Sequence, residues 1–282
     1  MELAEKTRKY PILWFLVGVS FIACYLPAFQ WLHYKFQGQD SYYSHGYLIP
    51  FVTAYLIYLR RGEISRASVE SSSLGLVAVV LALMAHIFGV VGDINFVSGF
   101  SMVLFCFGCS LYLLGAPITR IIAFPLFFLV FMCPIPDAYI NIIALPTKSM
   151  ATGIALAMMD MVGIPYIREG FLVHLANATF VVGTPCNGMR SLIAFTALGL
   201  LMLYLFRTAW WKKALFLALI PLLALLLNGA RIALLLWIAY TYGEKAASPE
   251  SYLHDGSGLL VFVIGFIAMV LVLRKINEEK NG

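Results

Sequence analysis

Long apolar runs separated by short polar segments dominate the chain. Each run is about 15–25 residues long, and roughly 20 helical residues cross the hydrocarbon core of a membrane. We therefore predict an all-α, polytopic membrane protein with about eight spanning helices. The predicted spans are residues 10–29, 46–60, 74–92, 96–115, 119–134, 188–206, 212–241 and 256–274. The first resembles a signal peptide in its basic start, but the seven behind it favour a retained signal anchor.

Two further segments do not fit the pattern of spans. Residues 137–163 are apolar but carry Asp137, Lys148 and Asp160, so we interpret them as a re-entrant or interfacial helix rather than a full crossing. Residues 171–182 are rich in β-branched and aromatic side chains and lie between two glycines, which predicts a short β-hairpin on the outer face.

Composition agrees with a membrane protein. Of the 282 residues, 62% are hydrophobic and 12% are charged, and the mean hydropathy is +0.89. Soluble domains are about 45–50% apolar and about 25% charged, so a soluble globule is excluded. The net charge of +5 is spread thinly, without the basic patch that nucleic-acid binding needs. We expect one integral-membrane domain over residues 1–282, surrounded by the lipid bilayer.

The basic residues predict the orientation of the chain. Cytoplasmic loops are enriched in Lys and Arg, and the assignment with both termini inside places the majority of the 19 basic residues there. The residues on the inner side are then Lys6, Arg8, Lys9, Arg60, Arg61, Arg66, Arg120, Arg207, Lys212, Lys213, Arg274, Lys275 and Lys280. A full crossing by residues 137–163 would move Arg207, Lys212 and Lys213 outside, which is a second reason to place that segment at the interface.

The segment 184–191 (TPCNGMRS) carries the first candidate chemistry. Cys186 precedes a predicted span, and the free N–H groups and dipole of a helix N-terminus favour a thiolate. Gly188 permits a close approach of a substrate backbone, Asn187 can form hydrogen bonds and Arg190 adds positive charge. The alternative is that Cys186 is a small buried side chain, as in most membrane helices.

Two more polar features lie on the same predicted side of the membrane. Asn228 and Arg231 are three residues apart and share a helix face in the outer half of a span. A guanidinium inside a membrane is costly, and it suits either an anionic oxygen or an intramembrane acid. His254 lies at the outer mouth of the last span. A thiol, a fixed cation and a base that titrates near neutrality together indicate a cysteine-dependent acyl-transfer site.

The other cysteines and histidines are weaker candidates. Cys133 is a rival nucleophile near the outer face, but it has no neighbouring cation or glycine. Cys106 and Cys109 form a C-x-x-C within a span without a second pair, so we expect no metal or cofactor. His45 opens the second predicted span on the outer side and could line the same cavity. His86 and His174 are interpreted as structural.

Several of these segments resemble one known family. The CNGMRS segment is similar to the C-S-G-x-R-S segment of exosortases and archaeosortases, and N228-x-x-R-I and His254 follow in that family's order. The segments YSHG at 43–46 and IREG at 167–170 also resemble recurrent family segments. The resemblance spans about residues 40–270, and it implies a catalytic core of that extent.

The resemblance implies a membrane-embedded cysteine transpeptidase of the bacterial cytoplasmic membrane, with its site facing the periplasm or exterior. Cys186 would be the nucleophile, Arg231 would stabilise the transition state and His254 would act as acid and base. Asn187, Gly188, Arg190, Asn228 and His45 would support them or bind substrate. The substrates would be membrane-anchored proteins with a C-terminal sorting signal of the PEP-CTERM type, transferred to an amine or lipid nucleophile. His254, where archaeal members have Arg, favours the bacterial exosortases, and Asn187 departs from their usual Ser.

Two other classes of function remain open from the residues alone. A polytopic transporter or channel would use Arg231, Asn228 and His45 to line a pathway with access from both sides. A scaffold for an exopolysaccharide or sorting apparatus would tolerate the loss of all three candidate catalytic residues. The arrangement of thiol, cation and base on one side favours the enzyme.

Overall fold

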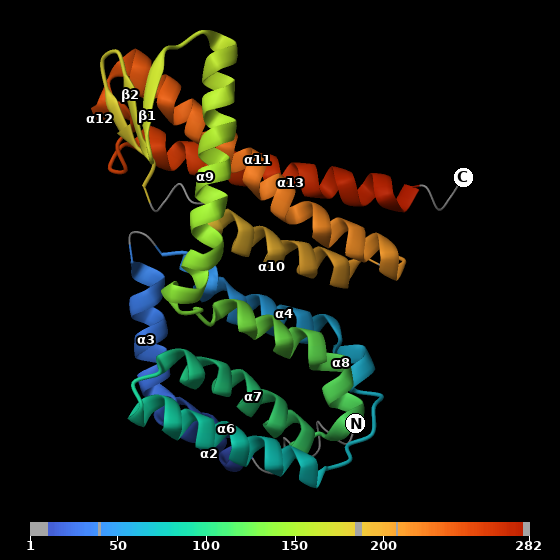
Figure 1. Cartoon of the computed structure of the whole chain (residues 1–282). Helices are drawn as coiled ribbons and strands as arrows, with labels where there is room; N and C mark the ends of the chain where they lie inside the picture. Colours follow the sequence, from blue (N-terminus) through green and yellow to red (C-terminus); the bar gives the residue numbers. More distant parts are fainter. Residues whose placement is uncertain (1–10, 39–40, 184–187, 207, 279–282) are drawn as a thin grey trace. The chain divides into compact units, whose positions relative to one another are not determined.

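The computed structural model describes residues 11–38, 41–183, 188–206 and 208–278. Helices make up most of this part of the chain, and a small antiparallel sheet interrupts them between residues 166 and 181 (Figure 1). The chain divides into two compact units, Met1–Pro136 and Asp137–Gly282, each with its own packing. The single integral-membrane domain stays a prediction.

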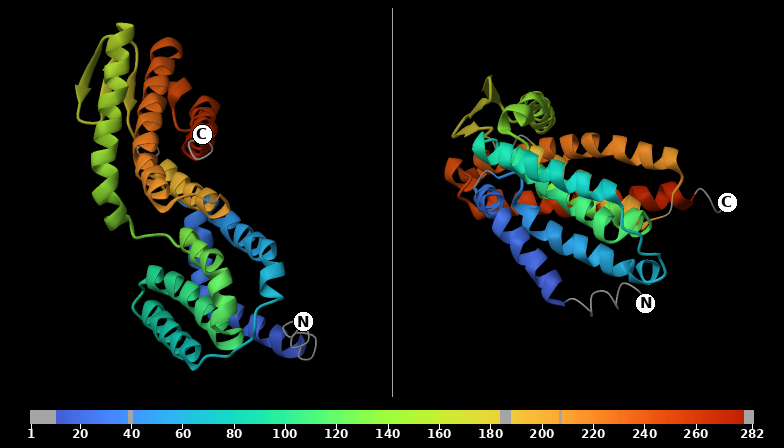
Figure 2. Two further views of the ribbon diagram at one scale, coloured as in Figure 1. Left: turned by 90° about the vertical axis from the view of Figure 1, so that its right-hand side faces the viewer. Right: turned by 90° about the horizontal axis from the view of Figure 1, so that it is seen from below.

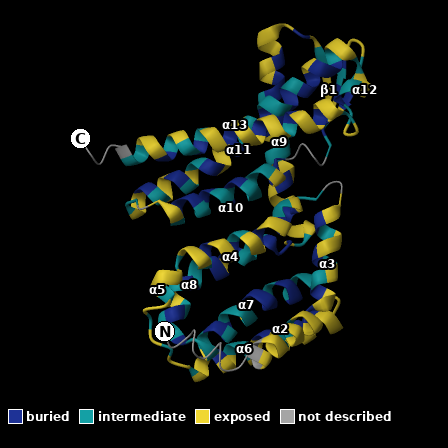
Figure 3. Ribbon diagram, turned by 180° about the vertical axis from the view of Figure 1, so that it is seen from behind, coloured by how far each residue is buried: buried dark blue, intermediate teal, exposed yellow. Residues whose placement is uncertain are grey.

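The first unit is helical throughout the residues described in it. Its α-helices are α2 (Pro11–Cys24), α3 (Leu26–Gln37), α4 (Ile49–Leu59), α5 (Arg61–Ile64), α6 (Ser73–Val91), α7 (Asn95–Leu113) and α8 (Gly115–Phe128). Two 3₁₀ helices, η1 (Ser44–Leu48) and η2 (Leu129–Met132), precede α4 and follow α8. Large apolar side chains are exposed along α2, α4 and α6 (Figure 3), as expected for helices in contact with lipid.

Helices α6 and α7 form a hairpin whose backbones touch at glycines. A Cβ added at Gly75 would lie 2.2 Å from the backbone nitrogen of Tyr112, and one at Gly108 would lie 2.8 Å from that of Val79. In a membrane, where lipid is as apolar as leucine, helices associate by close packing of this kind. These glycines therefore set the distance between the two helices.

His86 joins three helices of the first unit. Its Nδ1 lies 2.8 Å from the hydroxyl of Ser98 on α7, and its Nε2 lies 2.9 Å from the carbonyl oxygen of Cys24 at the end of α2. The ring also lies against Tyr25, with 4.3 Å between the centroids. A buried polar ring is tolerated because both of its nitrogens have partners. The prediction that His86 is structural is confirmed.

The second unit combines five helices and the sheet. The helices are α9 (Asp137–Val162), α10 (Met189–Leu205), α11 (Trp210–Tyr242), α12 (Glu244–Ala247) and α13 (Tyr252–Glu278). The strands are β1 (Tyr166–Glu169), β2 (Leu172–Leu175) and β3 (Thr179–Val181), paired antiparallel in the order β1-β2-β3. In the register, Tyr166 faces Leu175 and Val173 faces Phe180.

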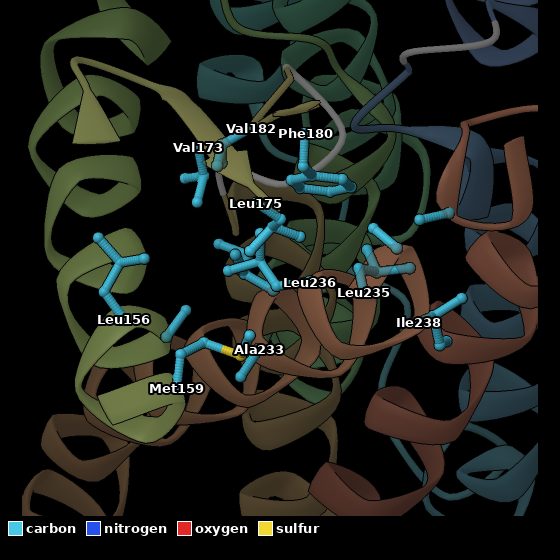
Figure 4. Packing of buried hydrophobic residues seen from close by; sticks show 14 of the residues in the cluster. Leu156, Met159, Val173, Leu175, Phe180, Val182, Ala233, Leu235, Leu236 and Ile238 are labelled. Atoms are coloured by element: carbon cyan, nitrogen blue, oxygen red, sulfur yellow. The ribbon is translucent and has the colours of Figure 1, made fainter. Parts of the chain in front are cut away.

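One hydrophobic cluster joins α9, the sheet and the C-terminal half of α11. Figure 4 shows Leu156 and Met159 of α9, Val173 and Phe180 of the sheet, and Leu236 of α11 among its members. Contact is closest at Gly229, where an added Cβ would lie 2.6 Å from a methyl group of Ile154. Asn177 lies in the β2–β3 turn and joins this turn to α11 by donating to the carbonyl oxygen of Tyr240 at 2.6 Å. We call this part of the unit, α9 with the sheet, α12 and residues 232–242, the cap.

A second cluster holds α10, α13 and the N-terminal half of α11 together. Phe195, Phe216, Ile220 and Met269 are almost fully buried in it. A Cβ at Gly265 would lie 2.2 Å from the ring of Phe195, so α13 approaches α10 closely. Helix α9 runs crosswise to α10 and α13, as the two views in Figures 1 and 2 show. Helix α9 of the cap therefore has a different direction from helices α10 and α13 of this helical bundle.

Helices α11 and α13 run antiparallel over the thickness of one membrane. At one end, Lys212 donates to the carbonyl oxygen of Ile276. At the other end, Arg231 donates to Ser257. From Trp210 to Arg231 is 21 residues, or about 31 Å at about 1.5 Å per residue, close to the roughly 30 Å of a hydrocarbon core. The remainder of α11 extends beyond that length into the cap.

The predicted spans need correction in number and in length. Among the described residues, six helices are long and apolar enough to cross a membrane, and the bent pair α2–α3 brings the number to seven, against about eight predicted. Helix α4 has only 11 residues because a 3₁₀ turn precedes it, and α10 has 17. The first span bends by 63° at Tyr25, next to Pro27, whose ring disrupts a continuing helix.

Residues 137–162 form a single continuous helix of 26 residues, which also meets the length and composition of a span. It does not fold back within the described residues, so a re-entrant segment is not observed. The hairpin predicted at 171–182 is present as β2 and β3, and β1 adds a third strand that the sequence analysis did not foresee. Gly170, with φ of +63°, makes the tight β1–β2 turn.

We expect Gly75→Leu to lower the free energy of unfolding by about 1–3 kcal/mol or more, because the α6 and α7 backbones must separate to admit the side chain. The control is Gly18→Leu on α2, where an added Cβ meets nothing within 4 Å. Thermal unfolding in detergent would compare the two variants. Equal stability for both would contradict glycine-mediated packing of this hairpin.

Candidate active site

The first turns of two helices, α10 and α13, lie against the middle of α11 in the second unit. Helix α10 begins at Met189, α13 begins at Tyr252, and Arg231 on α11 lies between them in contact with α13. This meeting point is at the opposite end of the α11–α13 pair from Lys212 and Ile276. The local sequence explains it, since each helix starts after a glycine- or serine-containing loop that ends an extramembrane connection.

Gly188 caps α10 and packs on Asn228. Its φ of +76° lies in the left-handed region, which favours glycine. A Cβ at this position would lie 3.1 Å from Nδ2 of Asn228, a side chain that is only 2% exposed. Helix α10 therefore begins against the buried amide of Asn228 on α11.

Arg231 is held by the first turns of α13. Its Nε donates to Oγ of Ser257 at 3.1 Å, and its Nη2 donates to the carbonyl oxygen of His254 at 3.4 Å. Ser257 in turn donates to the same carbonyl at 2.6 Å. Gly258 lies beside the guanidinium, since an added Cβ would be in van der Waals contact with Nη2 at 3.4 Å. We call Arg231, Ser257 and His254 together the Arg231–Ser257–His254 cluster.

The two nitrogens of the His254 ring differ: among the described residues, one has a hydrogen-bond partner and the other has none. Nδ1 lies 3.3 Å from the carbonyl oxygen of Ala247, the last residue of α12. A carbonyl only accepts, so Nδ1 carries the hydrogen, and in the neutral ring Nε2 is the basic nitrogen. Nε2 is buried and has no hydrogen-bond partner among the described residues, and the residue is only 4% exposed. Such an orphaned acceptor is unusual in a folded interior and points to a chemical task.

The structure brings together four of the sequence-predicted residues in two pairs: Arg231 contacts His254, and Gly188 packs against Asn228. Arg190 lies in the first turn of α10 with an exposed side chain. Cys186 and Asn187 lie outside the described residues. His45 is in η1 of the first unit, which is described separately, so its part in the site stays a prediction.

The rival nucleophile Cys133 has a structural environment. It lies in the first unit, it is 1% exposed, and its Sγ donates to the carbonyl oxygens of Gly99 and Leu129 at 3.3 and 3.8 Å. A thiol enclosed in this way is inaccessible to a polypeptide substrate. Within the part of the chain that the structure describes, no group of three His, Cys, Asp or Glu residues is placed to hold a metal ion.

The sequence analysis missed two groups at this site, the hydroxyl of Ser257 and the carbonyl of Ala247. Ser257 is three residues after His254 and thus on the same helix face, a spacing that was available as a signal in HDGSG. The carbonyl of Ala247 carries no such signal, because only the fold of α12 brings it to the ring of His254.

Comparison with known proteins identifies a family. The model of the transmembrane exosortase family (Exosortase_EpsH) matches residues 31–271. This range includes most of both units, the whole cap and the Arg231–Ser257–His254 cluster. No curated protein and no solved structure gives a significant match.

We expect Gly188→Ala to slow substrate processing by about tenfold or more, because its Cβ displaces the amide of Asn228 beside the site. The matched control is Gly163→Ala. Gly163 has a similar φ of +73° but nothing within 4 Å of an added Cβ. Both variants bear a backbone cost of about 1–2 kcal/mol, visible as a lower unfolding temperature. Equal processing rates for the two would show that the Asn228 contact has no functional effect.

Proposed function

Because the chain belongs to the transmembrane exosortase family, we propose that it cleaves C-terminal sorting signals of exported proteins through a thioester to Cys186. It is a multi-pass membrane protein, and its family implies a transpeptidase-like enzyme acting on proteins with a sorting signal. The observation that carries the proposal is the buried Nε2 of His254, which has no hydrogen-bond partner among the described residues and belongs to a residue bonded to the guanidinium of Arg231.

His254 supplies the acid and base in this proposal. The Ala247 carbonyl fixes the tautomer in the way that a carboxylate or amide does in other nucleophile–histidine pairs, and it leaves Nε2 to exchange a proton with the thiol. Cys186 is two residues before Gly188, and two residues of chain reach at most about 7 Å. The proposal therefore has the nucleophile act close to Gly188, which packs on Asn228.

The reaction has two balanced halves. The Cys186 thiolate attacks the scissile carbonyl carbon, Nε2 of His254 delivers its proton to the leaving amine, and the C–N bond breaks to leave a thioester. An acceptor amine, a lipid nucleophile or water then loses its proton to Nε2 and attacks the thioester, and the C–S bond breaks. Arg231 stabilises the oxyanion of both tetrahedral intermediates with charged donors that are held in place beforehand.

The orientation of the second unit supports a site on the outer face. The end of the bundle opposite Arg231 carries Lys212, Lys213, Arg274 and Lys275, a basic cluster typical of the cytoplasmic side. With that end inside, Arg231 and His254 lie one membrane thickness away, facing the periplasm or exterior, and the C-terminal end of α13 is inside. The enzyme would reside in the bacterial cytoplasmic membrane.

In this orientation the cap lies over the outer leaflet. Helix α9 runs crosswise to α10 and α13, so it lies along the membrane surface if those two helices cross the membrane. Its exposed apolar side chains, Tyr139, Ile143, Met150 and Met161, repeat at helical spacing and suit contact with the outer leaflet. The sorting signal of a membrane-anchored substrate would then meet the site at the interface.

We expect Cys186→Ala to fold and to leave a tagged substrate unprocessed, because the nucleophile is absent. Immunoblotting of substrate coexpressed with each enzyme would measure this. Cys133→Ala is the control, and it should process substrate normally once its folding is verified. Full processing by Cys186→Ala would eliminate the thiol mechanism and would leave a transporter, a channel or a scaffold as the alternatives.

We expect Arg231→Lys to slow processing by about a hundredfold, because an ammonium keeps the charge but loses the planar set of donors. The variant should still insert and fold, which limited proteolysis can verify. Initial rates of substrate cleavage in membranes would give the effect. An unchanged rate would mean that Arg231 is structural only.

A further inference from the structure

The Ser257 hydroxyl joins the proposed acid–base residue to the proposed oxyanion donor. It accepts from Nε of Arg231 at 3.1 Å, and it donates at 2.6 Å to the carbonyl oxygen of His254, which is three residues earlier in the same helix. Ser257 is 4% exposed, so water does not compete for these bonds. A serine inside a helix commonly makes the second bond alone, whereas the first bond reaches to another helix.

We propose that Ser257 is a positioning residue that aims the guanidinium of Arg231 at the reacting carbonyl. The proposal rests on the proposed function above. Nε is one edge of the planar guanidinium, and a bond at that edge fixes the rotation of the whole plane about the side chain. The Nη2 bond to the His254 carbonyl, at 3.4 Å, is longer and restrains the plane less.

The packing around the guanidinium agrees with a fixed plane. Gly258, the residue after Ser257, lies against Nη2, Cζ and Nε, which an added Cβ would approach to between 3.4 and 3.8 Å. A glycine thus lies beside the guanidinium while its Nε edge is bonded to Ser257. Loss of Ser257 would leave the charge of Arg231 in place, but it would remove the bond that sets the orientation of the guanidinium donors.

This role predicts a defect in turnover rather than in substrate binding. Without the hydroxyl, the bond at the Nε edge is lost, and an oxyanion donor whose plane is held less firmly stabilises the transition state less. We expect Ser257→Ala to lower kcat by about tenfold to a hundredfold, the usual range for a bond to a charged group. The KM for the sorting signal should stay within about twofold.

A double-mutant cycle tests the proposal because lysine has no Nε edge for Ser257 to hold. Ser257→Ala should slow the wild-type enzyme by about tenfold or more, but should slow the Arg231→Lys enzyme by about twofold or less. Equal losses in both backgrounds, or no loss in the wild type, would overturn the proposal. Ser257→Thr, which retains the hydroxyl, should recover most of the turnover.

The matched control is Ser101→Ala in the first unit. Ser101 is 3% exposed and donates to the carbonyl oxygen three residues before it, at 2.7 Å, as Ser257 does. It should lose stability similarly but keep its turnover. If Ser257→Ala does not accumulate, Ser257→Cys takes its place in the same cycle. An active Cys186→Ala would refute the proposed function itself, whereas an additive cycle with an inactive Cys186→Ala would refute only the role of Ser257.

Discussion

A permanently charged guanidinium within the long apolar helix α11 is the constraint around which the second unit is arranged. An ionised side chain costs at least about 2.5–3.5 kcal/mol at the centre of a membrane helix, so Arg231 needs acceptors and a place near the interface. Ser257 and the carbonyl of His254 are its acceptors on α13, and both are neutral. Supplying them requires α13 to start beside Arg231, and the same first turn carries the His254 ring into the site. Charge solvation and catalytic geometry are therefore provided by the same helix contact.

The cap contributes to the site by orienting His254 from outside the helical bundle. Residues 232–242 of α11 continue past the length of one membrane and pack with α9 and the sheet in one cluster (Figure 4). Helix α12 follows α11 directly, and its last carbonyl orients His254. The tautomer of the proposed base thus depends on a helix of four residues outside the bundle. Because no ionised partner is used, the ring is oriented without another charge being brought into a poorly solvated place.

The sequence predicts the helical membrane class, the short strands before residue 184 and the proximity of Arg231 to His254. Apolar runs and the spacing of rare polar residues carry that information, because both follow from the cost of polar groups in lipid. The exact spans are less predictable. Hydropathy does not reveal the bend at Tyr25, and it cannot distinguish a crossing helix from one that runs crosswise, as α9 does. Backbone partners such as the Ala247 carbonyl are invisible because every residue has a carbonyl.

The central claim is that substrate carbon becomes bonded to Cys186 beside the Arg231–Ser257–His254 cluster. Trapping with hydroxylamine tests it most directly, because this nucleophile intercepts a thioester and leaves a hydroxamate on the acyl group. Mass spectrometry of the new C-terminus of a sorting-signal substrate, cleaved in membranes with hydroxylamine present, would read out the result. The account predicts a C-terminal hydroxamate with the wild-type enzyme and none with Cys186→Ala. A free carboxylate alone from the wild type, with hydroxylamine in large excess, would contradict an acyl-enzyme.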